Sequence, residues 1–179
     1  MEKKVYLNAQ DYLRDMWRLA RQIRDSGWKP DVLLALWRGG AEVGVVIHEY
    51  LKANGISVRH MPIKCSSYTG IGTSNTEVKF EHADSVLQGL TPGTKVLVAD
   101  DVFDTGRTAA AVHGKLEALG CDMRMACVYW KPEKNVTPYN PDFYVRTLDR
   151  WIVFPHEIEG LTPDEIMDKD PILAELMGK

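Results

Sequence analysis

The sequence predicts an α/β fold built on a central, mostly parallel sheet flanked by helices. Short apolar runs suited to buried strands recur along the chain, and helical patterns separate them. Strands that alternate with helices in this way form parallel sheets. The length of 179 residues fits one domain of ordinary size, so a single domain over residues 1–179 is expected.

The predicted elements follow in a regular order. The opening segment places apolar side chains at helical spacing after Asn8, a candidate N-cap, and it is followed closely by Gly27. Later helical patterns end at glycine in the same way. The expected helices cover 9–25, 41–53, 107–119 and the acidic tail after Pro163, and the expected strands cover 31–37, 57–64, 95–102, 123–130, 143–146 and 151–154.

One segment interrupts this order. Residues 66–78 are polar and glycine-rich and show no periodicity, which predicts a flexible loop over about residues 65–80. Loops of this length in a compact domain are usually functional or disordered.

Composition argues against several classes of partner and location. A net charge of −3 gives no reason to expect a nucleic acid or a membrane held by bulk electrostatics. The three cysteines have no metal-ligand spacing, and their odd number argues against a disulfide framework. The N-terminus lacks a signal-peptide core, and no apolar run approaches the roughly 20 residues of a membrane span. A cytoplasmic protein is therefore expected.

An acidic pair marks a candidate site. Asp100 and Asp101 end an apolar strand and are followed by a short turn into a helix. In open α/β sheets, ligands bind outside the carboxyl ends of the strands. The two carboxylates are therefore expected at the mouth of a site.

The turn after this pair has the composition of an anion cradle. Residues 104–108 offer a glycine, two hydroxyls, an arginine and the unpaired amides of a helix start. A phosphate there would be repelled by the carboxylates unless Mg²⁺ or ribose hydroxyls satisfied them. The structural alternative makes the aspartates turn formers, with Asp104 as a helix cap. A receiver domain also carries an acidic pair, but here too little sequence follows the pair.

The run from Val96 to Thr108 resembles the signature of type I phosphoribosyltransferases that binds 5-phosphoribosyl 1-pyrophosphate (PRPP). The resemblance implies the fold of that family, in which a small hood accompanies the sheet. It implies that Asp100 and Asp101 meet the ribose hydroxyls and Mg²⁺. The residues implied to hold the 5-phosphate are Asp104, Thr105, Gly106, Arg107 and Thr108.

Two further segments fit the same family. Arg38-Gly39-Gly40 follows the first long strand, where the family has its pyrophosphate loop, although a Gly-Gly turn there is also common in other proteins. Ser67 and Tyr68 resemble the start of the catalytic flexible loop, which excludes water from the reaction. Both segments are implied to contact pyrophosphate.

The base-binding residues are suggested by the end of the chain. Lys131 in Trp-Lys-Pro, followed by Trp151 and Ile152, resembles the bacterial xanthine-guanine enzyme and its archaeal purine relatives. The lysine would read a 6-oxo group and Trp151 would stack on the base, although the alternatives are a solvated strand end and a core aromatic. Glu157 stands where the family often has an aspartate ligand of a second Mg²⁺. The resemblance implies a core over about 28–132 and a hood from about 140–160 with N-terminal contributions.

The expected function is Mg²⁺-dependent transfer of 5-phosphoribosyl from PRPP to hypoxanthine, guanine or xanthine, with Asp104 as the group that accepts the purine N7 proton. Lys131 argues against adenine, whose 6-amino group is itself a donor. The alternatives are an enzyme for another base, such as orotate or uracil, and a regulator that binds PRPP or nucleotide without turnover. By analogy with the family, a homodimer or homotetramer is expected.

Overall fold

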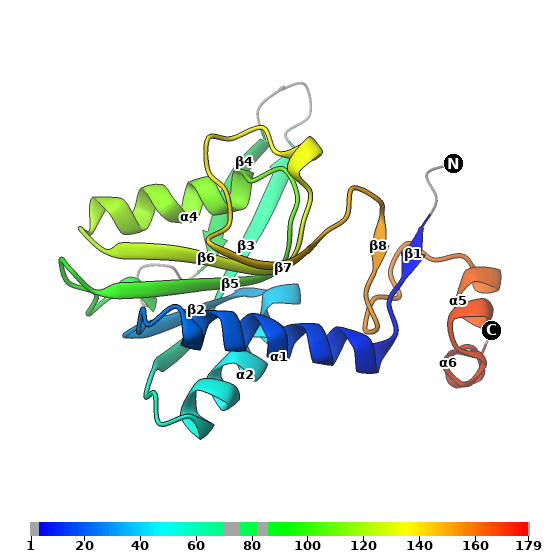
Figure 1. Cartoon of the computed structure of the whole chain (residues 1–179). Helices are drawn as coiled ribbons and strands as arrows, with labels where there is room; N and C mark the ends of the chain where they lie inside the picture. Colours follow the sequence, from blue (N-terminus) through cyan, green and yellow to red (C-terminus); the bar gives the residue numbers. More distant parts are fainter. Residues whose placement is uncertain (1–3, 70–75, 82–85, 179) are drawn as a thin grey trace. The chain divides into compact units, whose positions relative to one another are not determined.

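The computed structural model describes residues 4–69, 76–81 and 86–178. The chain divides into two compact units (Figure 1). The larger unit is Leu13–Asp149, and the smaller one combines Met1–Tyr12 with Arg150–Lys179.

The larger unit is built on a six-stranded sheet with the order β4-β3-β2-β5-β6-β7. Every neighbouring pair is parallel except β3 and β4, which are antiparallel. This confirms the predicted α/β class with a mostly parallel sheet. The strands are β2 (Val32–Trp37), β3 (Arg59–Thr69), β4 (Thr76–Glu81), β5 (Lys95–Phe103), β6 (Asp122–Trp130) and β7 (Phe143–Thr147).

Helices flank this sheet on both faces. α4 (Arg107–Ala118) lies on one face, and α1 (Ala9–Asp25) and α2 (Gly39–Ala53) lie on the other (Figure 1). Asn8 caps α1 as predicted, since its Oδ1 accepts hydrogen bonds from the amides of Gln10 and Asp11 at 2.9 and 3.2 Å. Within the described ranges, no helix has the length and apolar character needed to cross a membrane.

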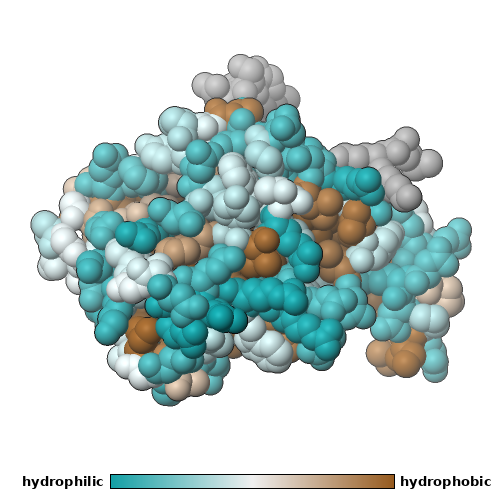
Figure 2. Space-filling view, viewed as in Figure 1, coloured by the Kyte–Doolittle hydropathy of each residue, from teal (hydrophilic) through white to brown (hydrophobic). Residues whose placement is uncertain are grey.

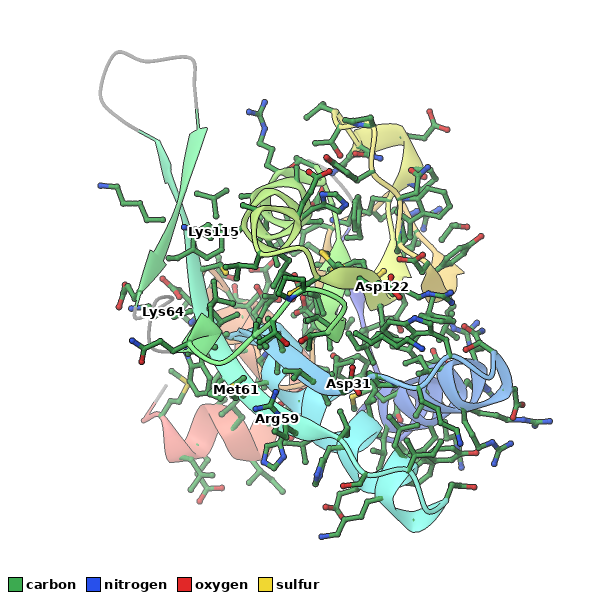
Figure 3. All side chains as sticks on the ribbon, turned by 90° about the vertical axis from the view of Figure 1, so that its left-hand side faces the viewer. Asp31, Arg59, Met61, Lys64, Lys115 and Asp122 are labelled. Carbon is green, nitrogen blue, oxygen red and sulfur yellow. The ribbon has the colours of Figure 1, made fainter. Side chains whose placement is uncertain are left out.

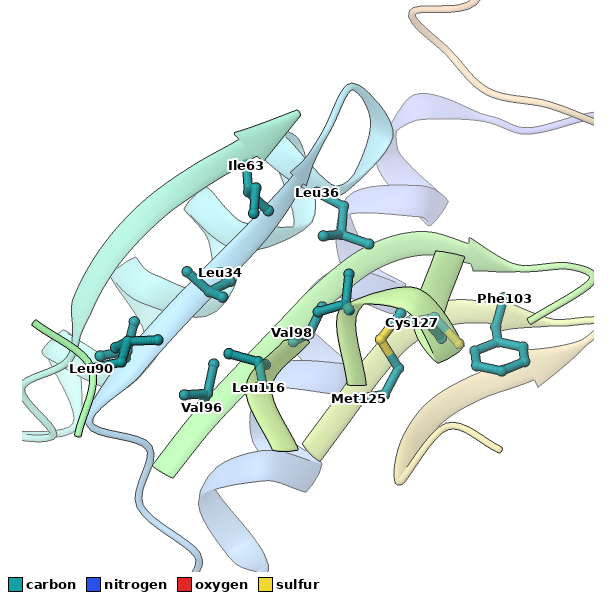
Figure 4. Packing of buried hydrophobic residues seen from close by; sticks show 13 residues of the cluster. Leu34, Leu36, Ile63, Leu90, Val96, Val98, Phe103, Leu116, Met125 and Cys127 are labelled. Atoms are coloured by element: carbon teal, nitrogen blue, oxygen red, sulfur yellow. The ribbon is translucent and has the colours of Figure 1, made fainter. Parts of the chain in front are cut away.

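The core beneath α4 follows from strand alternation. Leu34 and Val98 belong to a buried cluster that also contains Leu116 of α4 (Figure 4). Leu33, of opposite parity, is buried outside this cluster. A Cβ at Gly44 of α2 would lie 2.6 Å from the Cβ of Ala35, so α2 packs against the face of opposite parity. Full burial of a Leu or Val side chain in these two layers contributes about 1.5–3 kcal/mol to the stability of the fold.

The strand order creates a switch point between β2 and β5. Their register pairs Val32 with Val96 and Ala35 with Ala99, so their carboxyl ends lie side by side. The helices that follow these two strands, α2 and α4, lie on opposite faces of the sheet. In open sheets of this type, the ligand crevice opens at this point.

At the amino ends of the strands, away from the switch point, hydrogen bonds of Asp31 link three strands of the sheet. Figure 3 shows Asp31, Arg59 and Asp122 at the amino ends of their strands. The Asp31 carboxylate accepts a hydrogen bond from the Lys95 amide at 2.8 Å, and its carbonyl accepts one from the Arg59 amide at 3.0 Å. Asp31 therefore aligns β2, β3 and β5 at the end away from the switch point.

The predicted loop over residues 66–78 is wrong at both of its ends. β3 continues to Thr69 and β4 begins at Thr76, while residues 70–75 lie outside the described residues. The missed signal is the alternation of Val78 and Phe80 with charged neighbours, which has the period of a strand. Pairing of Phe80 with Cys65 extends both strands beyond the rest of the sheet.

The smaller unit has its own two-stranded parallel sheet of β1 (Val5–Tyr6) and β8 (Ile152–Val153). The single helix expected after Pro163 is two short helices, α5 (Pro163–Lys169) and α6 (Pro171–Leu176). Asp170 separates them, because it ends α5 and its carboxylate caps α6. Apolar side chains of these helices are exposed, as Figure 2 shows over their surface, and they include Met167, Ile172 and Leu176.

A buried carboxylate joins α1 to β7. Asp15 is 2% exposed and accepts hydrogen bonds from Arg146 Nε at 2.7 Å and from Arg18. Burial alone would raise the pKa of Asp15, but the hydrogen bonds and charges of the two arginines outweigh it and hold this pKa below its ordinary value. A carboxyl group with a lowered pKa stabilises the fold above its unfolded pKa, and this contribution is lost as the pH falls through the folded value.

We therefore expect Asp15→Asn to lower the free energy of unfolding by about 1–3 kcal/mol at pH 7, because it removes the charge that pairs with both arginines. Urea unfolding of both proteins at pH 7 and near pH 3 checks this, and the difference between them should shrink at the lower pH. Asp25→Asn, in the exposed ion pair with Arg24, is the control and should change little. A difference independent of pH would contradict the role of the Asp15 charge.

Candidate active site

The loop after β2 and the acidic pair of β5 meet at the switch point. A Cβ added to Gly39 would overlap the Asp101 carboxylate, and one added to Gly40 would overlap the Ala99 carbonyl oxygen. The peptide bond between Trp37 and Arg38, just before these glycines, is cis. Gly40 is therefore required here, because a side chain at this position would meet the backbone of β5, whereas a side chain at Gly39 would force the Asp101 carboxylate to move.

The acidic pair lies within β5 and not after it, since the strand continues to Phe103. Asp100 Oδ1 accepts a hydrogen bond from the Asp101 amide at 3.0 Å, and Asp101 Oδ1 accepts one from the Val102 amide at 2.7 Å. Burial raises the pKa of Asp100 well above its ordinary value, and the neighbouring Asp101 charge adds to this. A cation or hydroxyl donors at this position would offset the repulsion.

The turn that follows β5 forms an open helix start. Gly106 has φ +77°, a left-handed conformation that favours glycine, and it precedes α4 with no side-chain cap on the helix. The first turn of α4 contains no acidic residue. A pocket opens here, and its lining combines the acidic strand end with the turn: Asp100, Val102, Phe103, Asp104, Thr105, Gly106, Thr108, Ala109 and Met125. Uncapped helix amides and a positive dipole end suit an anion.

Asp104 does not cap α4, so that alternative is wrong. Its Oδ2 accepts a hydrogen bond from Lys131 Nζ at 2.9 Å. Lys131 is 6% exposed, and its amide donates to the Phe103 carbonyl at 2.9 Å, which fixes the end of β6 beside the turn. Two residues predicted separately, as proton acceptor and as base reader, are thus in direct contact.

Of the other residues predicted to contact pyrophosphate, Arg38 is described in full, and Ser67 and Tyr68 are described only by their backbone. Arg38 is exposed just before α2. Ser67 and Tyr68 belong to β3, where they pair with Val78 and Glu77 of β4, but their side chains lie outside the described residues. Their predicted contact with pyrophosphate therefore stays a prediction.

The remaining predicted residues belong to the smaller unit. Trp151 is 51% exposed, and its carbonyl accepts a hydrogen bond from the Val5 amide at 2.8 Å. Ile152 is buried and pairs with Val5. Glu157 Oε2 accepts a hydrogen bond from the Phe154 amide at 3.3 Å, so this carboxylate closes its own turn. The ring of Trp151 offers an open face for stacking, in contrast to the expected alternative of a core aromatic.

The carboxylates at β5 suit Mg²⁺ if a bound ligand and water supply most of its other oxygen ligands. Asp100 and Asp101 are hard oxygen ligands next to an anion cradle, and the pKa of Asp100 is raised by burial first and by the neighbouring Asp101 charge second. Across the parts of the chain that are described, no group of three or more histidine, cysteine or acidic side chains could hold a metal ion. A metal at this site would therefore need the oxygens of a phosphate-bearing ligand.

Sequence reasoning missed the residues that support the site. Asn135 and Thr137 lie against Gly106, where an added Cβ would meet their side-chain oxygens. Asn135 Oδ1 accepts hydrogen bonds from the amide and hydroxyl of Thr137 at 3.0 and 2.9 Å, which builds a small polar wall beside the turn. Lys169 of α5 donates to the turn that contains Glu157. No sequence spacing links these residues to their partners.

Similarity to known proteins agrees with this geometry. The chain is 32% identical over 111 residues to an adenine phosphoribosyltransferase of Microcystis aeruginosa, covering 59% of this chain and 60% of that enzyme. It is 28% identical over 144 residues to a hypoxanthine-guanine phosphoribosyltransferase of Aquifex aeolicus, covering 78% and 77%. The crystal structure of a purine phosphoribosyltransferase from Pyrococcus horikoshii has a TM-score of 0.73 at 29% identity and covers 89% of this chain and 97% of its own.

The alignment thus spans only about 60% of the first of these relatives. The family model for the phosphoribosyl transferase domain, however, matches residues 3–160, which is most of the sequence. The fold, the switch-point site and this match agree, and the chain belongs to the phosphoribosyl transferase domain family.

Proposed function

We propose that this protein transfers the 5-phosphoribosyl group of PRPP to a 6-oxopurine, which yields a nucleoside 5′-monophosphate and pyrophosphate. The observation that carries the proposal is the contact of Gly39 with the Asp101 carboxylate. It brings a glycine loop and an acidic pair together at one switch point, and the cradle at Gly106 follows directly along β5. PRPP has the matching order of groups, with pyrophosphate, ribose hydroxyls and 5-phosphate.

Each part of PRPP has a proposed set of contacts. The amides and hydroxyls of residues 104–108 bind the 5-phosphate, supported by the uncapped start of α4. The ribose hydroxyls donate to Asp100 and Asp101, because hydroxyl donors offset the repulsion between these neighbouring carboxylates. Arg38 and Gly39 receive pyrophosphate, together with Ser67 and Tyr68 of β3. This division follows the order of the elements along the edge of the sheet.

Asp100 and Asp101 would hold Mg²⁺ jointly with the oxygens of PRPP. When bound, Mg²⁺ supplies positive charge that offsets the charge developing on the departing pyrophosphate. The side chains themselves form no covalent intermediate. The proposed role of this chain is to position the two substrates and to keep the reacting bond away from water.

Asp104 is the proposed proton acceptor. As the purine nitrogen bonds to C1′ of the ribose, the bond from C1′ to the pyrophosphate oxygen breaks and the purine loses a proton, which Asp104 takes up. The hydrogen bond from Lys131 orients the Asp104 carboxylate. The Lys131 ammonium has three donors and no acceptor, so it can also donate to a 6-oxo group, while the 6-amino group of adenine offers it no acceptor.

The smaller unit is proposed to supply further base contacts, and we assign it as the hood. Trp151 would stack on the purine ring, a contact worth about 1–3 kcal/mol per base in nucleic-acid-binding proteins. The backbone of Ile152 and the turn at Glu157 would read the 2-position. Glu157 as a ligand of a second metal has weak support, because its Oε2 already accepts from the Phe154 amide. Assembly into a homodimer or homotetramer stays a prediction.

The first test is a steady-state assay with PRPP, Mg²⁺ and each of hypoxanthine, guanine, xanthine and adenine. We expect turnover of a 6-oxopurine that falls by about 10²- to 10⁴-fold in Asp104→Asn, since loss of a general base has an effect of this size. Asp164→Asn, on the exposed start of α5, is the matched control and should keep wild-type rates. Absence of turnover with every purine, despite measurable PRPP binding, would favour another base or a regulator.

A second test addresses the base. We expect Lys131→Met to lower kcat/KM for the preferred 6-oxopurine by about 10- to 100-fold, because a hydrogen bond from a charged group is lost. The rate with adenine should fall less, so the measured quantity is the ratio of kcat/KM between hypoxanthine and adenine. Equal losses for both bases would limit Lys131 to orienting Asp104.

A third test addresses the contact at the switch point. Gly39→Ala inserts a methyl group against the Asp101 carboxylate, and we expect the Kd for PRPP to rise by about 10-fold or more, since overpacking of this kind costs about 1–3 kcal/mol. Gly114→Ala is the control, because an added Cβ meets nothing within 4 Å in the middle of α4. That variant should bind PRPP normally and be slightly more stable. Unchanged PRPP binding by Gly39→Ala would remove this loop from the pyrophosphate site.

A further inference from the structure

A single side chain holds the turn that follows β8 in the smaller unit. Lys169, the last residue of α5, donates from Nζ to the carbonyl of Phe154 at 2.8 Å and to the carbonyl of Glu157. The same turn is closed from inside by the Glu157 amide, which donates to the Phe154 carbonyl at 3.0 Å. Lys169 therefore bonds both ends of one four-residue turn.

Both partners of this contact are themselves anchored. Phe154 is 5% exposed, and its ring packs edge-on against Tyr12 with centroids 5.3 Å apart. α5 is held at its other end by the Thr162 and Glu165 capping box and by an ion pair of Glu165 with Lys4 at 2.7 Å. Lys169 thus connects a helix that is fixed at its start to a turn that is fixed at Phe154.

The ammonium is partly buried where it makes these bonds. Burial lowers the pKa of Lys169, while the nearby Glu157 and Asp170 charges act in the opposite direction. A partly desolvated ammonium binds carbonyl oxygens more strongly than an exposed one, because less water competes for its donors. The turn loses two charge-assisted hydrogen bonds if this group is removed.

We propose that Lys169 is a positioning residue for the purine, acting through the turn from Phe154 to Glu157. The turn directly follows Trp151 and Ile152, to which the proposed function assigns the stacking and 2-position contacts. Movement of the turn would displace the backbone that reads the base, while the PRPP residues belong to the larger unit. This inference rests on the proposed function and extends it to a residue that touches neither substrate.

The test compares Lys169→Met with Lys169→Arg and with the control Glu175→Gln, which removes a charge from the exposed surface of α6 in the same unit. We expect Lys169→Met to raise the KM for the purine about tenfold, with the KM for PRPP and kcat within about twofold of wild type. Lys169→Arg should recover most of the affinity, and Glu175→Gln should leave the purine KM within about twofold. Equal rises in both KM values, or the same purine effect in Glu175→Gln, would overturn the proposal.

Hydrogen exchange by mass spectrometry gives a readout that does not depend on activity. The peptide containing residues 152–158 should exchange faster in Lys169→Met and not in Lys169→Arg, because the turn amides lose their support. Unchanged exchange would show that Lys169 does not hold the turn. If Lys169→Met fails to fold, Lys169→Gln, which keeps a weaker donor, replaces it. A wild-type protein that turns over no purine would overturn the proposed function and the base-positioning role together, while the exchange result would still decide whether Lys169 clamps the turn.

Discussion

The candidate site depends on one steric constraint, the direct approach of Gly39 to the Asp101 carboxylate. β2 and β5 are neighbours in the sheet, and their following helices lie on opposite faces, which opens a crevice at their carboxyl ends. Because position 39 has no side chain, the backbone of the loop after β2 can lie against the acidic pair of β5. A ligand at this point would meet backbone amides on one side and carboxylates on the other.

The charges around this contact would suit a ligand that carries both phosphates and a cation. Burial raises the pKa of Asp100, and the neighbouring Asp101 charge adds to this, so a cation or hydroxyl donors would favour the ionised carboxylate. A few residues further on, the uncapped start of α4 favours negative charge. An anion bound there without a cation would add to the repulsion at β5. A ligand that brings hydroxyls to the carboxylates and a cation to its phosphates satisfies both places at once.

Most elements could be predicted because their signals are local. The N-cap at Asn8 and the buried run of β2 follow from a few adjacent residues. The errors come from contacts distant in sequence or from weak periodicity. Asp104 was open to interpretation as a helix cap, because nothing local shows that Lys131, 27 residues later, takes its carboxylate. β4 is hard to predict because only two apolar residues, Val78 and Phe80, alternate with polar ones in this segment.

In the proposed function the choice of base rests on few groups, which fits the similarity of the chain to enzymes named for adenine and for hypoxanthine-guanine. In this proposal the contact of Gly39 with Asp101 and the turn at Gly106 serve only the phosphoribosyl donor, so similarity over these segments would not select a purine. Selection needs a buried polar group that one base satisfies and another leaves unpaired, since a mismatch of this kind is far more discriminating than a difference in size. Lys131, 6% exposed and a donor only, is such a group. One hydrogen bond joins Lys131, the proposed base reader, to Asp104, the proposed proton acceptor. A base that fails to engage the lysine would therefore also leave the acceptor poorly oriented, so recognition and chemistry would be lost together.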